Sequence, residues 1–364
     1  MPRCEIKVFT RRLALRRAFR IAHGSYAFRE SVFLHLSFDG RAGIGEAPIV
    51  PYYGVSTAEV EADLRTRLSG ELVRRAVDGD EIPPEAFRYA VSSCAFQTAV
   101  LSLRRRLRSN AEHGIAESAL SPGADSVPPT SYTIPNDDDV GSMVELAATC
   151  GFRRLKVKMG FENDIEGLRR IRERLPDAIL RVDANQGWAF DECIGKIAAL
   201  EELGIELIEE PINGDEHQLE QIAAATSIPV ILDESVRTVE QLHRYVQRAP
   251  SITGIVAKIA KNGGPLASYR LIREAHDLGL KVMVSSMIET SLGVAEAVRL
   301  ASRCQWCDLD TPLLLAHDPF VGLSYVDERP CFVAPPGSDA ADEVRPDGEL
   351  QSFIDALAPI PVDC

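Results

Sequence analysis

The chain has 364 residues, of which 45% are hydrophobic and 26% are charged, so it is long enough for a large core and for two domains. Its formal net charge of −14 argues against a nucleic-acid binder or a membrane-surface protein, because both need a basic face. No apolar run is long enough for a membrane span, and the eight cysteines are scattered, so we expect a reduced, cytoplasmic protein.

The N-terminal part of the chain, residues 1–115, is expected to form an α+β domain. Residues 4–47 alternate between apolar and polar side chains in short runs, which is typical of an antiparallel sheet. Within this sheet we expect two short strands around a polar turn at residues 5–21. A further turn is expected at residues 38–43, where the sequence reads FDGRAG.

Two helices are expected after this sheet. Ser56 and Glu59 form a capping box that opens a helix running to about residue 68. Residues 85–109 carry apolar side chains at three- and four-residue spacing, which predicts a long helix. A polar stretch rich in Ser, Gly and Pro, roughly residues 109–129, then marks the boundary of the domain.

From residue 131 onward, short apolar strands alternate with amphipathic helices. The eight strand candidates are SYTI, RLKVKM, AILRVD, ELIEE, PVILDE, GIVAKI, KVMVSS and CDLD. Alternating strands and helices imply a parallel sheet, and eight units imply closure into a barrel. We therefore predict an α/β protein with a (β/α)8-type, modified TIM barrel at residues 126–320. The alternative, an open doubly wound sheet, usually carries a GxGxxG motif after its first strand, and this motif is missing here.

The last part of the chain, residues 321–364, changes character again. It is rich in Pro and irregular, with no sustained strand or helix pattern. We expect this segment to run back over the N-terminal α+β domain and to complete it as a cap on the barrel.

Charged residues stand at the polar ends of successive barrel strands, about one barrel unit apart. They are Lys156, Lys158, Asp183, Glu209, Asp233 and Lys258. Each step is about 25 residues, close to the length of one strand-plus-helix unit. Because such a barrel gathers the carboxyl ends of its strands at one mouth, we expect three carboxylates and three lysines around one cavity.

The two neighbouring lysines are predicted to act in catalysis. Lys156 and Lys158 are two residues apart on a strand, so both side chains point the same way. Two adjacent ammonium groups lower each other's pKa, partial burial lowers it further, and a lysine poised near neutrality can act as a general base. The alternative is a solvated pair on an edge strand, but Leu155, Val157 and Met159 indicate a buried strand.

The three carboxylates are predicted to share one ion. Adjacent strands are about 4.8 Å apart, and an oxygen-only set suits Mg²⁺ or Mn²⁺. Acids at strand ends can instead cap the following helix. Lys258 lies across the barrel from the other two lysines. One lysine can therefore remove a proton from a carbon next to a carboxylate, and another can return a proton to the opposite face. The metal would stabilise the enediolate formed in between. Lys261 is expected to be a loop residue.

The order KxK, DAN, EEP, DES and KxxKxGG, with GEAP at residues 45–48, resembles the enolase superfamily in its muconate-lactonizing subgroup. The resemblance covers nearly the whole chain, and the motifs are specific together. It implies that Lys158 and Lys258 are the acid/base pair and that Lys156 lies beside the substrate carboxylate. It implies Mg²⁺ ligands at Asp183, Glu209 and Asp233, with supporting groups at Asn185, Glu210 and Glu234. It also favours a homo-oligomer.

Two further stretches resemble dipeptide epimerases. SSMIETSLG, residues 285–293, is similar to their seventh-strand motif and supplies the substrate-binding candidates Ser285 and Met287. Asp308 and Asp310 form a DxD at the end of the eighth strand, which in those enzymes holds the α-ammonium of the N-terminal residue. Two carboxylates on one side of a strand end form a clamp for a cation. The alternative is a pair of solvated loop aspartates.

The loop of the capping domain is expected to contact the far end of the substrate. In relatives that act on Ala-Glu, an arginine in this loop pairs with the glutamate, but alignment of residues 19–32 puts Gly24 at that place. Other polar residues nearby are Arg20, His23 and Arg29. We take His23, together with Thr133 on the first barrel strand, as substrate-binding candidates, and the sequence predicts no side-chain preference.

The sequence therefore predicts a Mg²⁺-dependent epimerase that acts on an L-amino-acid dipeptide. A cycloisomerase, an o-succinylbenzoate synthase or an N-acylamino-acid racemase would keep the same fold and site. Their substrates carry no free α-ammonium group, so the DxD would have no role in them. A barrel that binds a ligand without catalysis is the alternative of another class, but no lysine or metal ligand of the pattern is missing.

Overall fold

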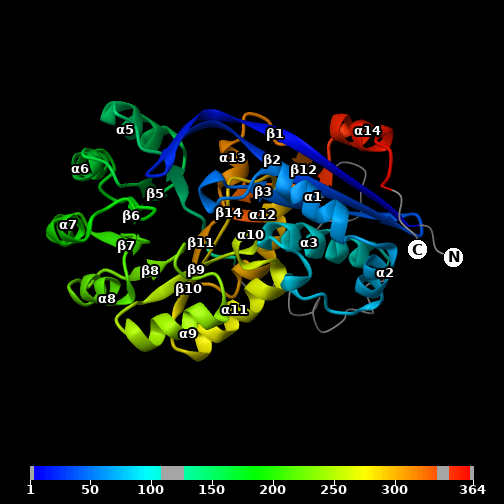
Figure 1. Cartoon of the computed structure of the whole chain (residues 1–364). Coiled ribbons are helices and arrows are strands. Elements are labelled where there is room, and N and C mark those ends of the chain that lie inside the picture. The colour runs from blue at the N-terminus through cyan, green and yellow to red at the C-terminus, as the bar shows by residue number, and fades with distance from the viewer. Residues whose placement is uncertain (1–3, 108–126, 334–343, 361–364) are drawn as a thin grey trace.

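The computed structural model describes residues 4–107, 127–333 and 344–360. Figure 1 shows two parts, an N-terminal cap built around three long strands and a barrel surrounded by helices. Most of the polar stretch expected to separate them, residues 109–129, lies outside the described residues.

The cap contains a three-stranded antiparallel sheet in the order β1-β2-β3. Its strands are β1 (Cys4–Ile21), β2 (Gly24–Phe38) and β3 (Arg41–Ile49). The expectation of two short strands within residues 5–21 is wrong, because β1 is one strand that pairs with β2 along most of its length. A register shift between Ala14 and Phe19 accommodates the arginine-rich stretch, as a β-bulge does.

The turn expected at residues 38–43 is confirmed. Asp39 and Gly40 join β2 to β3, and both have positive φ angles, 50° and 75°. Two consecutive residues with positive φ are what a tight hairpin turn matched to the twist of its strands requires.

The helices of the cap are η1 (Pro51–Tyr53), α1 (Thr57–Arg67), α2 (Gly70–Asp78), η2 (Pro84–Ala86) and α3 (Ala90–Leu107). Helices α1 and α3 pack against the sheet, and α2 and η2 pack against α3. The predicted capping box opens α1, since Ser56 and Glu59 exchange side-chain to backbone hydrogen bonds. The long helix begins at Ala90 rather than at 85, because the Asp63 carboxylate accepts the backbone N–H groups of the residues just before it.

Eight parallel strands form the barrel, in the unbroken order β4 to β11. They are β4 (Tyr132–Ile134), β5 (Arg154–Lys158), β6 (Ile179–Asp183), β7 (Ile205–Glu209), β8 (Val230–Leu232), β9 (Gly254–Lys258), β10 (Lys281–Ser285) and β11 (Trp306–Asp308). A parallel bridge between Thr130 and Cys307 brings the first and last strands together. The predicted barrel is confirmed, and the open doubly wound sheet is excluded.

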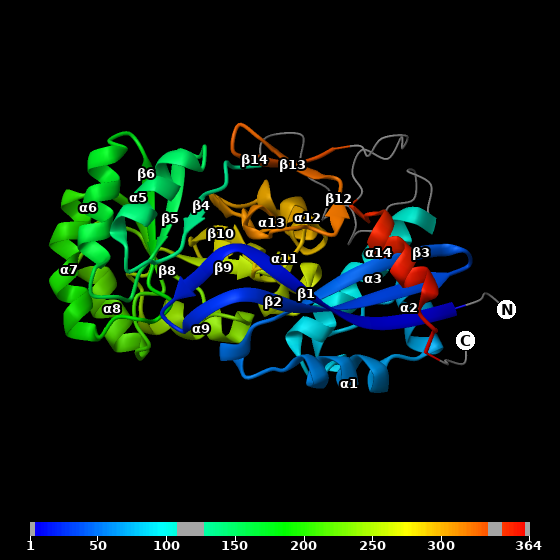
Figure 2. The same cartoon turned by 90° about the horizontal axis from the view of Figure 1, so that it is seen from above.

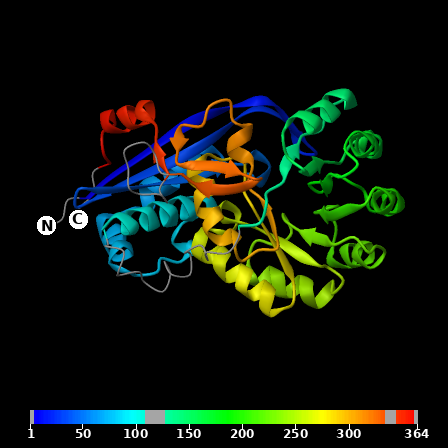
Figure 3. The same ribbon diagram turned by 180° about the vertical axis from the view of Figure 1, so that it is seen from behind.

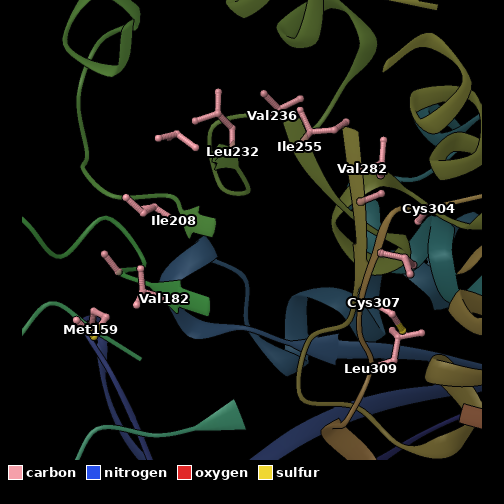
Figure 4. Close-up of a cluster of buried hydrophobic side chains, with 14 of the residues drawn as sticks. Met159, Val182, Ile208, Leu232, Val236, Ile255, Val282, Cys304, Cys307 and Leu309 are labelled. Atoms are coloured by element: carbon pink, nitrogen blue, oxygen red, sulfur yellow. The ribbon is translucent and has the colours of Figure 1, made fainter. Parts of the chain in front are cut away.

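Helices cover the outside of the barrel. They are α5 (Val140–Thr149), α6 (Asp164–Arg174), α7 (Phe190–Glu202), α8 (Glu216–Ala224), α9 (Val239–Arg248), α11 (Pro265–Asp277) and α12 (Ser291–Ala301). Two short helices, α10 (Ile259–Asn262) and α13 (Thr311–Leu314), lie instead at the barrel mouth after β9 and β11. Outward-facing strand residues such as Val182, Ile208 and Leu232 are fully buried beneath the outer helices, and Figure 4 shows part of this cluster. None of the helices within the described ranges is long and apolar enough to cross a membrane.

Two layers of side chains fill the inside of the barrel. The lower layer is apolar and consists of Leu207, Ile231, Val256, Met283 and Trp306. Arg181 lies beside them, fully buried, and donates to the Cys307 carbonyl over 2.8 Å. Because side chains alternate along a strand, the residues two positions further on also point inward and form the next layer. That layer is polar and contains Asp183, Glu209, Asp233, Lys258, Ser285 and Asp308.

The described parts of the C-terminal segment contact the cap, and they contain regular elements rather than irregular chain alone. It contains β12 (Phe320–Val321), β13 (Leu323–Val326), β14 (Arg329–Phe332), β15 (Arg345–Pro346) and α14 (Gly348–Ala356). Lys7 on β1 donates to the Ile354 carbonyl over 2.8 Å, and the Ile360 N–H donates to the Ile6 carbonyl over 2.7 Å. Figures 2 and 3 show α14 beside the cap and away from helices α6 and α7.

Candidate active site

The carboxyl ends of the barrel strands and the cap enclose a small cavity of about 50 Å³. Figure 2 shows the β1–β2 hairpin extending from the cap across the barrel. The lining residues are Phe19, Ile21, Arg29, Ile49, Val50, Tyr52, Thr133, Lys156, Lys158, Asn185, Lys258, Ser286, Met287, Ile288, Asp308 and Thr311. A larger cavity of about 600 Å³ lies beyond Tyr53 and Lys261, but the strand-end lysines do not line it.

Lys158 faces the first of the predicted metal ligands. It pairs in register with Asp183 on the neighbouring strand, and its Nζ donates to Asp183 Oδ2 over 2.5 Å and to Asn185 Oδ1 over 3.1 Å. Burial alone would raise the pKa of Asp183, but Lys158, Lys156 and Lys258 outweigh burial and hold this pKa below its usual value. Asp183 is therefore an ionised carboxylate.

Lys156 lies between several carboxylates. Its Nζ is 3.3 Å from Glu209 Oε2 and 3.4 Å from Asp183 Oδ2, and it also donates to Asp308. Burial would lower the pKa of Lys156, but Asp308, Glu209 and Asp183 outweigh it and raise this pKa well above its usual value. The expected lowering by burial and by a neighbouring ammonium group is therefore wrong for Lys156, because carboxylates surround it.

Lys258 and Lys261 both contact Asp233, on the opposite side of the barrel. Lys258 donates to Asp233 Oδ2, and Lys261 donates to Asp233 Oδ1 over 2.8 Å and to the Val256 carbonyl over 2.7 Å. Asp233 raises the pKa of Lys258 well above its usual value despite burial. Lys261 lies in helix α10 and is buried, so its assignment to a loop is wrong. Its ammonium group contacts both the side chain and the backbone carbonyl of Asp233.

Two carboxylates of the site have oxygen atoms that are free to bind a cation. Glu209 Oε1 and Glu234 Oε2 are buried, and neither has a hydrogen-bond partner among the described residues. Burial raises the pKa of Glu209 to about 7, and the Asp183 charge adds to this effect. Within the described residues, no group of three His, Cys, Asp or Glu side chains has the geometry of a metal site. The ammonium groups of Lys156, Lys158 and Lys258 lie against these carboxylates instead. A buried oxygen without a donor is a position where a hard cation relieves an unfavourable charge.

The residues that follow the ligands hold unusual backbone conformations. Asn185, Gln186 and Glu210 have φ angles of 44°, 64° and 39°, which non-glycine residues rarely adopt. Asn185 Nδ2 donates to Glu234 Oε1 over 3.1 Å, and the Asp233 N–H donates to Glu210 Oε2 over 2.6 Å. Asn185, Glu210 and Glu234, the predicted supporting residues, therefore form hydrogen bonds within the site. These bonds hold the carboxyl ends of the strands in position.

The two aspartates of the DxD lie in different surroundings. Asp308 ends β11, lines the cavity and accepts hydrogen bonds from Ser131 over 2.7 Å and Ser285 over 2.9 Å. Asp310 lies beyond the strand and accepts the Thr133 N–H over 2.6 Å. Burial raises the pKa of Asp310 to about 7, and the Asp308 charge adds to this effect. The alternation of side chains along β11 therefore points Asp308 into the barrel. Asp310 lies beyond the strand, and its hydrogen bonds to Thr133 fix its position instead.

Most lining residues from the cap were not predicted. Phe19, Ile21, Ile49 and Tyr52 bring apolar surface against the lysines. Apolar residues of this kind look like ordinary core positions in a sequence, and only the Pro-Tyr-Tyr-Gly run around Tyr52 hinted at a loop. His23, a predicted contact, is exposed and stacks on Tyr52 with ring centroids 4.4 Å apart, outside the lining set.

Comparison with known proteins gives a consistent result. The family model described as enolase C-terminal domain-like matches residues 140–333. The chain is 31% identical over 338 residues to the L-Ala-D/L-Glu epimerase of Bacillus subtilis, covering 87% of this chain and 91% of that protein. The chain belongs to the enolase superfamily, and the predicted resemblance to its dipeptide epimerases is confirmed.

Solved structures agree with this family. An enolase family member from Agrobacterium tumefaciens with homology to dipeptide epimerases, with bound sodium and L-Ala-L-Glu, has a TM-score of 0.79 and 30% identity and covers 92% of this chain and 99% of its own. A dipeptide epimerase from Methylococcus capsulatus, complexed with Mg and L-Arg-D-Lys, has a TM-score of 0.77 and 25% identity and covers 93% and 98%. The predicted enzyme class, an isomerase of the epimerase kind, is confirmed.

Proposed function

We propose that this enzyme epimerises a dipeptide at the α-carbon of its C-terminal residue. The observation that carries the proposal is the placement of Lys158 and Lys258, which line one cavity from strands β5 and β9. A substrate between them presents one face of its α-carbon to each ammonium group. One lysine, as the free amine, removes the α-proton, and the other, as the ammonium, donates a proton to the opposite face.

Asp183, Glu209 and Asp233 are proposed to hold a divalent cation, Mg²⁺ in the first place and Mn²⁺ as a substitute. The unpartnered Glu209 oxygen and the Mg in the Methylococcus capsulatus structure support this assignment. When bound, the cation supplies positive charge that stabilises the enediolate left by proton removal. A cation held there would neutralise part of the carboxylate charge that raises the pKa of Lys258.

The remaining residues of the site are proposed to bind and orient the substrate. Lys156 binds the substrate carboxylate. Asp308 and Asp310 bind the α-ammonium group of the N-terminal residue. Hydrogen bonds between charged groups such as these are stronger than those between neutral groups. Contacts from the barrel come from Thr133, Ser285 and Met287, and His23 acts only through the lining residue Tyr52, on which its ring stacks. The supporting hydrogen bonds around the carboxylates come from Asn185, Glu210 and Glu234.

The decisive experiment incubates the purified protein with Mg²⁺ and pooled L,L-dipeptides in D₂O and measures incorporation by mass spectrometry. Uptake of one deuterium at the α-carbon of the C-terminal residue, with inversion at that carbon, is the expected result in the wild type, and the inversion should be lost in both Lys158→Ala and Lys258→Ala. Exchange in N-acyl- or N-succinyl-amino acids but in no dipeptide would replace the proposal with a racemase of acylated amino acids. The absence of exchange in all of them, with folded and metal-loaded protein, would contradict it altogether.

A further inference from the structure

The cavity of about 600 Å³ beyond Tyr53 and Lys261 lies outside the active site, between the cap and the barrel. We call it the outer cavity. It lies where helix α3 of the cap contacts helices α10 and α11, which Figure 1 shows near one another. Its lining includes Tyr53 and Phe87 from the cap and Arg237, Lys261 and Leu271 from the barrel. Sites for small ligands usually have volumes of roughly 300–1,000 Å³, so the outer cavity is large enough to be one.

A thin wall separates the outer cavity from the active site. Ile49 and Val50 line both cavities. Tyr53 lines the outer cavity and packs edge-on against Tyr52, which lines the active site, with ring centroids 4.9 Å apart. The three strand-end lysines do not line the outer cavity. A molecule held there would contact the back of this wall without reaching the proposed acid/base groups, so the proposed chemistry leaves the outer cavity without a role.

Arg237 brings an unpaired positive charge to the outer cavity. It lies half-buried between β8 and α9, and it lines the cavity. Its Nε donates to the Glu234 carbonyl over 3.2 Å, but neither Nη atom has a hydrogen-bond partner among the described residues. No carboxylate in the same ranges lies within ion-pair distance of this guanidinium. The two Nη atoms are therefore available to a ligand.

The contacts of Arg237 hold its guanidinium in one orientation without neutralising it. Its Cζ lies 4.4 Å from the centroid of the Tyr53 ring, so the guanidinium lies over this ring. Asn262 Nδ2 donates to the Arg237 carbonyl over 3.0 Å and holds the backbone as well. A planar guanidinium that is held by stacking and by its Nε atom presents its two Nη atoms as a fork, which suits two-point binding of a carboxylate.

The other charged residues of the lining are paired or exposed. Lys261 and Arg270 form ion pairs of their own. Glu85, Arg88 and Glu240 are exposed, and water and salt screen charges at such positions. Among the charged lining residues, Arg237 is therefore the one that is both partly buried and unpaired, and the outer cavity favours an anion near it.

The rest of the lining offers apolar surface. Phe87 and Leu271 are buried side chains of this wall, and Val55, Val91 and Ala267 are half-buried beside the cavity. Such a surface gains free energy when an apolar group covers it, by about 25 cal/mol for each Å² removed from water. A ligand that fits both features carries one negative charge and an apolar body.

We propose that the outer cavity binds a small carboxylic acid with an apolar body. The carboxylate binds the Nη atoms of Arg237, and the body covers Phe87 and Leu271. This ligand is separate from the substrate of the proposed reaction. Its binding is measured without turnover, so the inference does not depend on the proposed function.

The test compares 3-phenylpropanoate with 3-phenylpropanamide, which has nearly the same shape but no charge. Titration calorimetry of the purified protein with each compound measures the two dissociation constants. The wild type should bind the acid with a dissociation constant of about 1 mM or below, and it should bind the amide at least about tenfold more weakly.

Two variants locate this binding. Ala267→Trp places a large side chain at the wall of the outer cavity and should abolish binding of the acid. Arg237→Met should weaken binding of the acid roughly tenfold and leave the amide within about threefold, because only the acid uses the charge.

Arg273 provides a matched control for Arg237. It lies on α11, is exposed, and has its Cζ 5.9 Å from the centroid of the Tyr269 ring, outside the lining of the outer cavity. Arg273→Met therefore removes a stacked arginine elsewhere on the barrel and should leave both dissociation constants unchanged. Melting temperatures of all variants show whether the fold is intact.

Four results would overturn the inference. Two concern the wild type alone, namely no saturable binding of the acid, or equal binding of the acid and the amide. A third is an Ala267→Trp protein that binds the acid as tightly as the wild type does, since the acid would then bind elsewhere. The fourth is an Arg237→Met protein that loses the same factor for the acid and the amide. The first three need no change at Arg237, so they apply even if Arg237→Met does not fold.

Discussion

Thr290 in the barrel donates both its backbone N–H and its hydroxyl to the carboxylate of Glu46 in the cap. The N–H lies 3.1 Å from Glu46 Oε2 and the hydroxyl 2.5 Å from the same atom, while Ser31 donates to Oε1 over 2.7 Å. Glu46 belongs to the GEAP segment, and Thr290 follows the lining residues Met287 and Ile288 in the chain. These bonds therefore couple the position of the cap to the seventh-strand end of the active site.

This contact makes stability depend on pH. Burial raises the pKa of Glu46 to about 7 from the usual 4.5, although the bonds from Thr290 and Ser31 act in the opposite direction. Between these values the folded protein holds a proton that the unfolded chain has lost. The contribution of Glu46 to the free energy of unfolding is therefore present below about pH 4.5 and is lost as the pH rises through about 7.

Replacing Glu46 by Gln should remove this dependence, because an amide has the same shape but does not ionise. The melting temperature of Glu46→Gln relative to wild type should rise by a few degrees between about pH 5 and about pH 8. Calorimetry at several pH values measures this difference. A gap that stays constant or shrinks with rising pH would contradict the assigned ionisation of Glu46.

The two lysines should fail in complementary ways. In Lys158→Ala and Lys258→Ala, epimerisation should fall by a factor of about 10²–10⁴, the usual value of one acid/base group. Each variant retains the base for one face, so each should still exchange the α-proton of one epimer, and the two variants should differ in which epimer that is. NMR of separate L,L and L,D substrates in D₂O measures both exchanges. Loss of the same exchange in both variants would contradict the two-base arrangement.

Removing a predicted cation ligand should lower activity because the enzyme then binds less metal. Asp233→Asn should lower metal content, measured by elemental analysis, and lower kcat by at least about a hundredfold, since it removes one charge from the set. In wild type, chelation followed by dialysis should remove activity, and added Mg²⁺ should restore it. Asp191→Asn, an exposed acid in the first turn of α7, is the control and should retain both metal and rate.

Arg181 should matter for stability rather than for chemistry. It is fully buried in the lower layer, where its Nε lies 2.6 Å from Glu206 Oε2 and its Nη1 donates to the Cys307 carbonyl. Arg181→Leu leaves these acceptors without their donor, so the free energy of unfolding should fall by about 2–4 kcal/mol. Urea titration measures this change. Arg169→Leu on the exposed face of α6 should change it by less than about 0.5 kcal/mol.

The barrel and its charged layer could be predicted from the sequence. The alternation of side chains along a strand, and the length of one strand-plus-helix unit, can both be read from short stretches of the chain. Asp183, Glu209 and Lys258 each end an apolar run, and the pairing of parallel strands then brings them to one level. Contacts across the cap could not be predicted in this way, since Arg29 and Glu46 face residues far along the chain. A buried arginine and an exposed one look alike in a sequence, and only the hairpin's position over the barrel distinguishes them.

The pair of aspartates after the eighth strand distinguishes the proposed dipeptide substrate from acylated amino acids. Asp308→Asn and Asp310→Asn should each lower dipeptide exchange by roughly 10- to 100-fold, because one ionised hydrogen bond to the α-ammonium is weakened. Metal content should persist, since neither residue belongs to the predicted cation ligands. Asp327→Asn, an exposed residue in the β13–β14 turn, is the matched control and should keep full activity. Unchanged dipeptide exchange in both site variants would assign the ammonium group to another partner, and Asp308 would then serve only to position Lys156.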